Sequence, residues 1–238
     1  LLFTIILPVI IGLSTITAQN VNIPDANFKA ALVGNSSINT NADGEIQTAE
    51  ATAYTGTINV NSLNISDLTG IEAFTAISSL SCESNQLTNL DVSANTALTS
   101  LSCYNNQLTN LDISTNLSLN FLGCGNNPLS TIDVSANTAL TSLVCINNQL
   151  TGLDVSANTA LVNLWCYQNQ LTSLDVSANT ALTVLKCYQN QLTSLDVSAN
   201  TDLVDLYCSS NQLTNLDVSA NTNLTTLSCF LNQLTILD

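Results

Sequence analysis

Residues 161–181 read LVNLWCYQNQLTSLDVSANTA, and this 21-residue unit decides the fold. Leu161, Leu164 and Cys166 follow the spacing LxxLxC, which turns three apolar side chains to the same side of a short extended segment. The stretch LTSLDV repeats that spacing within the same unit. The pattern predicts one coil with two inward-facing apolar segments, which cannot be stable until further coils cover it.

The unit recurs along the chain at a constant interval of 21 residues. The copies share the pattern LxxLxCxxNQLTxLDVSANTA with few departures, and one cysteine in each copy marks the period. These cysteines are Cys82, Cys103, Cys124, Cys145, Cys166, Cys187, Cys208 and Cys229. The repeats therefore predict eight stacked coils, about 35 to 40 Å long, with two parallel strand ladders on opposite sides.

From Ile77 to the last residue, this pattern closely resembles the leucine-rich-repeat family, with Cys where that family has Leu. It is most similar to the short 21-residue bacterial subtype, and LTGIEAF at 68–74 resembles the opening of internalin-type repeats. The resemblance implies an all-β-rich solenoid, a right-handed leucine-rich-repeat coil with parallel strand ladders. It also implies a secreted bacterial protein whose strand face binds its ligand.

The first segment, residues 1–18, is typical of a secretory signal that is cut near Ala18. A transmembrane helix is the weaker interpretation, because the apolar run is short and Pro8 and Gly12 interrupt it. The segment lacks an initiator Met and a basic stretch, so we expect the given sequence to begin inside the signal. The mature chain is then expected to be secreted or held at the cell surface, without membrane insertion.

Two further regions follow the signal. Residues 19–57 are not repetitive and predict an N-terminal cap, in which Asp25 and Gly34 bracket a short helix. Residues 58–238 predict the leucine-rich-repeat solenoid. The sequence stops within a repeat, so we expect the natural array to continue toward a polar cap or an anchoring domain.

The negative charge of the chain argues against nucleic acids and anionic membranes as partners. Lys and Arg together number 2 against 17 acidic residues, which gives a net charge of −15. Such a chain repels the phosphates of nucleic acids and the surface of an anionic membrane. We therefore expect an extracellular protein or glycan as the partner.

The cysteines, asparagines and aspartates of the repeats are expected to be structural. The cysteines hold an inward position and predict buried thiols; parallel neighbouring side chains suit disulfides poorly, and a single row without His suits a metal site poorly. Two asparagine rows, from Asn85 to Asn232 and from Asn95 to Asn221, predict turns with buried amides. The aspartate row either accepts local hydrogen bonds or recruits cations. It comprises Asp91, Asp112, Asp133, Asp154, Asp175, Asp196, Asp217 and Asp238.

The residues on either side of each Cys differ from copy to copy, and aromatic side chains gather among them. An exposed aromatic cluster combines large apolar area with hydrogen-bonding edges, which is typical of a recognition surface. The alternative is that the rings only stack along the ladder and stabilise the sheet. The candidate ligand-binding residues are Tyr104, Trp165, Tyr167, Lys186, Tyr188 and Tyr207.

Within the cap, residues 39–50 read NTNADGEIQTAE and resemble the EF-hand calcium loop, with Asn at the first position where that family has Asp. The implied ligands are Asn39, Asn41, Asp43, Glu45 through its backbone carbonyl, and Glu50. Because few ligands are charged, the loop predicts weak Ca²⁺ binding, with a Kd of about 10⁻⁴ to 10⁻³ M. The alternative is a metal-free Asx turn that leads into a helix.

These features favour an extracellular or cell-surface binding and adhesion module over an enzyme. A solenoid polysaccharide-degrading enzyme is one alternative, but the array holds no Arg, no His and only Lys186 as a cation, and only Asp202, Asp205 and Glu83 are acids outside the aspartate row. A binder of ice or crystal surfaces is another, based on the hydroxyl row of Thr88, Thr109, Ser130 and Thr151. The neighbouring aspartates disfavour it.

Overall fold

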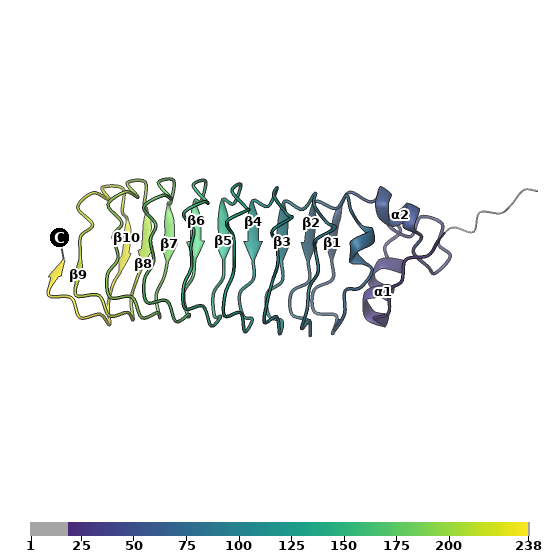
Figure 1. The fold of residues 1–238 in the computed structure, drawn as a ribbon, viewed down its shortest axis with the longest axis horizontal. Coiled ribbons are helices and arrows are strands. Elements are labelled where there is room, and N and C mark those ends of the chain that lie inside the picture. The colour runs from purple at the N-terminus through teal and green to yellow at the C-terminus, as the bar shows by residue number, and fades with distance from the viewer. Residues whose placement is uncertain (1–18, 238) are drawn as a thin grey trace, which may run out of the picture.

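The computed structural model describes residues 19–237, which form a small cap followed by a long row of stacked coils (Figure 1). The predicted signal segment, residues 1–18, lies outside the described residues, as does Asp238. Each repeat makes one coil, so positions 21 residues apart lie side by side along the row. The predicted repeat solenoid is confirmed.

Within residues 19–237, one parallel sheet runs the length of the solenoid in the order β1-β2-β3-β4-β5-β6-β7-β8-β10. Its strands are three residues long because the turns on either side leave only that much extended chain. Leu164, in the middle of β6, pairs with Leu143 and Leu185 in the adjacent coils. The strands are β1 (Thr57–Asn59), β2 (Ser79–Ser81), β3 (Ser100–Ser102), β4 (Phe121–Gly123), β5 (Ser142–Val144), β6 (Asn163–Trp165), β7 (Val184–Lys186), β8 (Asp205–Tyr207) and β10 (Thr226–Ser228).

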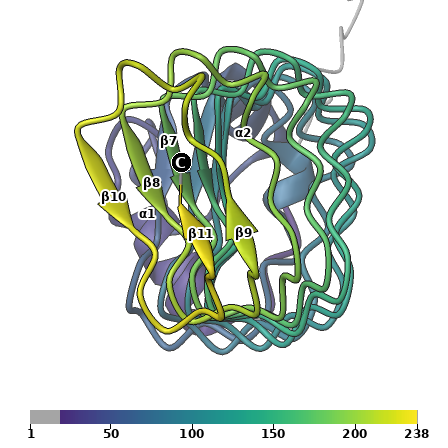
Figure 2. The same ribbon diagram turned by 90° about the vertical axis from the view of Figure 1, so that its left-hand side faces the viewer.

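The second ladder is shorter than the sequence predicts. In the described residues it consists of β9 (Asn215–Leu216) paired with β11 (Ile236–Leu237), and one isolated bridge between Asp91 and Asp112. These two strands lie across the coil from β8 and β10 (Figure 2). The Ser N–H to Asp bond occurs both where the segments pair and where they do not: Ser93 donates to the bridged Asp91 as Ser177 donates to Asp175.

The core is a continuous column of Leu, Cys and Val side chains. Leu164, Cys166 and Leu171, all from one coil, are completely buried. All eight thiols are free; seven are buried, and Cys229 in the last coil is partly exposed. The prediction of buried thiols is therefore confirmed. Burial raises the pKa of Cys82, Cys124 and Cys208 to about 12.

The asparagine rows satisfy backbone groups where the chain turns, as predicted. Asn169 Oδ1 accepts a hydrogen bond from Leu150 N at 3.1 Å, and its Nδ2 donates to Cys145 O at 2.9 Å and to Cys166 O at 3.1 Å. In the other row, Asn179 Nδ2 donates to the carbonyls of two turn residues of the preceding coil, Val155 and Asn158. Each amide thus ties adjacent coils together.

The N-terminal cap begins with the predicted helix, α1 (Ala26–Val33). The Asp25 carboxylate accepts hydrogen bonds from the first free N–H groups, and Gly34 ends the helix. Phe28 and Leu32, four residues apart, lie on one face and extend the core of the solenoid. Two short helices, α2 (Thr48–Ala53) and the 3-10 helix η1 (Ile71–Ala73), complete this end of the molecule.

Candidate functional site

The variable residues lie on the outer face of the long sheet. In β6 the middle residue Leu164 is buried, so the alternation of side chains turns Trp165 outward. The chain then buries Cys166 and turns Tyr167 outward again. The same geometry repeats in each coil, so two outward columns of side chains flank the buried cysteines.

Three of the candidate residues meet in one column. Lys186 in β7 is paired in register with Trp165 in β6 and with Tyr207 in β8. Its Nζ atom lies 4.0 Å from the centre of the Trp165 ring and 5.3 Å from the centre of the Tyr207 ring. The ammonium group is therefore held between two aromatic side chains by cation–π attraction.

The second column brings Tyr167 and Tyr188 together. Their ring centres are 4.2 Å apart and the rings are nearly parallel, at 12°. Burial raises the pKa of Tyr188 to about 12, with a further contribution from the adjacent Tyr167 hydroxyl, so the Tyr188 phenol remains neutral at physiological pH. The two tyrosine rings thus stack along the ladder and are also partly exposed on the outer face. We call Trp165, Tyr167, Lys186, Tyr188 and Tyr207 the aromatic platform.

A hollow of about 610 Å³ lies beside the aromatic platform, toward the last coils. Phe230 and Leu231 were not among the predicted site residues, although Phe230 follows Cys229 as Tyr167 follows Cys166. The shared position was the signal that could have identified Phe230. The hollow is lined by Tyr167, Lys186, Tyr188, Gln189, Tyr207, Ser209, Ser210, Ser228, Phe230 and Leu231.

Tyr104 is the one candidate that does not belong to the aromatic platform. Its ring lies across the neighbouring coil, where Gly123 and Gly125 leave no side chains: a Cβ atom at Gly123 would be 2.6 Å from Tyr104 Cε2. Burial of the ring raises the pKa of its hydroxyl. Tyr104 therefore fills the surface over the glycine coil.

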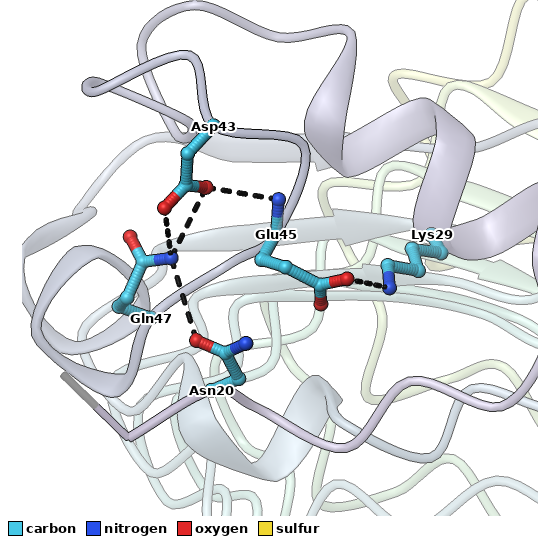
Figure 3. Close-up of polar contacts among 5 residues, drawn as sticks. All are labelled: Asn20, Lys29, Asp43, Glu45 and Gln47. Carbon is cyan, nitrogen blue, oxygen red and sulfur yellow. Dashed lines mark hydrogen bonds and ion pairs between the residues drawn. The ribbon is translucent and has the colours of Figure 1, made fainter. Parts of the chain in front are cut away.

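The predicted calcium loop closes on itself through hydrogen bonds (Figure 3). Asp43 Oδ1 accepts a hydrogen bond from Glu45 N at 3.0 Å, and Gln47 Nε2 donates to both Asp43 oxygens, at 3.2 and 2.9 Å. These bonds lower the pKa of Asp43, and the bond from Glu45 N–H contributes most to the shift. The Glu45 side chain forms an ion pair with Lys29 at 2.6 Å. The Asx turns of the metal-free interpretation are therefore present.

Two other loop residues are held by hydrogen bonds of their own: Glu50 to the backbone of the loop, and Asn39 to Val33 O at the end of α1. Glu50 Oε1 accepts a hydrogen bond from Thr40 N at 2.7 Å, and Glu50 Oε2 accepts one from Gln47 N at 3.1 Å. Asn39 is 6% exposed, and its buried Oδ1 has no hydrogen-bond donor. Among the described residues, no three His, Cys, Asp or Glu side chains are grouped to hold a metal ion, so a cation here would need amide and carbonyl oxygens in addition to carboxylates.

The aspartate row has the local hydrogen bonds expected of a structural role. Asp175 and Asp196 each accept a 2.9 Å bond from the backbone N–H two residues later. Hydrogen bonds from the side chain and backbone of Ser177 lower the pKa of Asp175, so it stays ionised. The same arrangement recurs from coil to coil, which leaves this side of the solenoid uniform while the strand face varies.

Stacked 21-residue coils, an inward Leu and Cys pattern and asparagine turns define the chain as a leucine-rich-repeat protein. The structure is similar to the functional domain of InlJ from Listeria monocytogenes, which includes a cysteine ladder, with a TM-score of 0.75 and 39% identity. This match covers 93% of the chain and 54% of that domain. No family model and no curated protein matches the sequence.

Two further solved structures have the same architecture. A leucine-rich-repeat protein of Leptospira interrogans has a TM-score of 0.71 and 26% identity over 76% of the chain and 50% of its own length. Internalin C2 of Listeria monocytogenes has a TM-score of 0.73 at 21% identity, over 93% of the chain and 97% of its own length. At this identity the likeness shows the fold alone. The chain thus spans about half the length of the first two structures.

Proposed function

We propose that the chain is an extracellular or cell-surface adhesion module that binds a protein or a glycan through the aromatic platform, and that it is not an enzyme. The observation that carries this proposal is the gathering of the only Trp, three of the five Tyr and one of the two basic residues on three successive coils. Partly exposed rings beside a hollow offer apolar area together with hydrogen-bonding edges.

The structural neighbours support a binding role. One of them is a plant peptide hormone receptor solved in complex with RGF2, which has 22% identity and a TM-score of 0.62. The signal-like segment at residues 1–18 supports an extracellular location. Within residues 19–237, no helix is long and apolar enough to cross a membrane.

The proposal predicts that Trp165→Ala combined with Tyr188→Ala weakens capture of the ligand by about thirtyfold or more. Truncating a central aromatic anchor commonly costs about 2 kcal/mol of binding free energy. The measurement is a pull-down with the mature protein from its natural surroundings, in which the amounts of captured protein and of captured carbohydrate are both quantified. Folding should survive, because both side chains lie on the outer face.

The matched control is Asp175→Asn combined with Asp196→Asn. These substitutions remove two negative charges on the opposite side of the solenoid and keep the size of both side chains. This variant should capture the ligand as well as the unchanged protein does. If the asparagine pair abolished capture and the alanine pair did not, the ligand would bind on the uniform side of the solenoid and the proposal would be wrong.

We also propose that the loop of residues 39–50 binds Ca²⁺ weakly. The specific observation in its favour is the Asn39 Oδ1 atom, which is buried at the first position of the loop without a donor. Asn41 and Asp43 hold their oxygens in Asx turns, and Gly44 has the positive φ of 83° that a tight loop needs. A cation would satisfy Asn39 at the cost of rearranging the amides of Asn41 and Gln47.

Calcium at 10 mM is accordingly expected to raise the melting temperature by about 3 to 5 °C, since a Kd of about 1 mM gives about 1.4 kcal/mol of stabilisation. Glu50→Ala should remove most of this increment, although it also loses the hydrogen bonds to Thr40 and Gln47. Differential scanning calorimetry with Mg²⁺ at equal ionic strength provides the control. An unchanged calcium increment in the variant would exclude the loop as the site.

A further inference from the structure

The aromatic platform contains two hydrogen-bond donors that no protein group satisfies. Within residues 19–237 the only ion pair joins Lys29 to Glu45, so the Lys186 ammonium has no carboxylate partner in a chain with 17 acidic residues. Asp205 lies on the same outer face at the start of β8, yet Lys186 Nζ is held over the aromatic rings instead. The Trp165 Nε1 atom is buried and also lacks an acceptor. Of the two, the Lys186 ammonium lies on the partly exposed outer face, where an acceptor from outside can reach it.

We propose that the aromatic platform recognises a carboxylate on a polypeptide partner, which Lys186 binds while an adjoining apolar side chain of the partner enters the hollow; this inference rests on the proposed function. Cation–π attraction holds the ammonium group in place without using its N–H donors, so a carboxylate can accept from them. The chain has a net charge of −15, and the residues that line the hollow include no acidic one. The positive charge of Lys186 is therefore not neutralised locally.

The hollow favours a polypeptide over a carbohydrate. The rings of Tyr188, Tyr207 and Phe230 lie on its wall, which suits an apolar side chain. Gln189, Ser210 and Ser228 offer side-chain donors and acceptors for a peptide backbone. Tyr167 and Tyr188 cover one face of each other, which leaves less ring surface for a sugar to stack on. A partner's carboxylate would match the Lys186 ammonium, and an apolar side chain next to it would match the hollow.

The test uses Trp165 as a reporter, because it is the only tryptophan in the chain. N-acetylphenylalanine, which carries a free carboxylate and an apolar ring, should change the Trp165 fluorescence saturably, with a Kd of about 1 to 10 mM, as expected for so small a ligand. N-acetylphenylalaninamide, which lacks the charge, should give no saturable change over the same range. Glucuronic acid carries a carboxylate on a sugar and should bind at least about tenfold more weakly than N-acetylphenylalanine.

Lys186→Gln should weaken the response to N-acetylphenylalanine by at least about tenfold, because it removes a charge-assisted hydrogen bond. Lys29→Gln removes the only other basic residue and should leave the response unchanged. Thermal melting establishes that both variants are folded. Equal responses to the acid and the amide, a response that survives Lys186→Gln, or no response to the acid would each overturn the inference, as would tighter binding of glucuronic acid. Loss of pull-down in the Trp165 and Tyr188 variant would still uphold the proposed function in those cases.

Discussion

An Asn169→Ala variant is expected to lose about 3 to 4 kcal/mol of the free energy of unfolding. The Asn169 side chain is buried, accepts a hydrogen bond from Leu150 N and donates to the carbonyls of Cys145 and Cys166. Alanine leaves these backbone groups without partners inside the solenoid. Each buried, unsatisfied group costs about 1 to 3 kcal/mol, and the carbonyls can recover part of this loss by bonding to water that enters the gap.

Urea denaturation followed by the fluorescence of Trp165 would measure this loss, because that residue lies in the same coil. Gln170→Ala is the control, since the Gln170 side chain is exposed and should change stability by less than about 0.5 kcal/mol. Asn179→Ala should have an intermediate effect, because its amide donates two hydrogen bonds and accepts none from the described residues. A loss below about 1 kcal/mol for Asn169→Ala would contradict the structural role of this row.

The thiols are expected to divide into one that reacts and seven that are protected. Only the thiolate attacks a thiol reagent, and burial raises the pKa of Cys82 and Cys124 from 9.0 to about 12. At pH 8 this shift lowers the thiolate fraction by about a thousandfold, and close packing excludes the reagent as well. Cys229 is partly exposed in the last coil and should react alone in the folded protein.

Labelling with a chromogenic disulfide at pH 8, before and after addition of denaturant, measures both populations. The fast phase should correspond to one thiol and should disappear in a Cys229→Ala variant, while unfolding should release the remaining seven. Rapid reaction of several thiols in the folded protein would show that the core column opens readily. Far fewer than eight thiols after unfolding would show that disulfides have formed.

The sequence was sufficient to predict the coil and much of the cap because these features depend on local spacing. The interval between Cys145 and Cys166 sets which residues lie side by side in adjacent coils, and the LxxLxC pattern sets the inward face. Asp25 and Gly34 bracket α1 because an N-cap carboxylate and a terminal glycine act within one turn of the helix. Repetition makes the cysteine interval and the LxxLxC spacing hold along the whole array, so little of the coil depends on distant contacts.

The second ladder shows where the local rules fall short. The LDV segments have the apolar spacing of a strand, yet among the described residues they pair only around β9 and β11 and in the bridge between Asp91 and Asp112. The local bond from a Ser N–H to the preceding Asp is present with and without such pairing, so the spacing of residues does not specify where this ladder forms.

What the sequence by itself determined is the solenoid, the burial of its thiols and the face on which its copies vary, since each follows from periodicity. Only the tertiary structure decided what the variable residues do. Lys186 lies between the rings of Trp165 and Tyr207, whereas Tyr104, at an equivalent position to Tyr167, lies down over Gly123. The physical reason is that an outward side chain takes its conformation from the coils on either side. The sequence period places that side chain on the face, but its neighbours' volumes determine whether it remains available to a ligand.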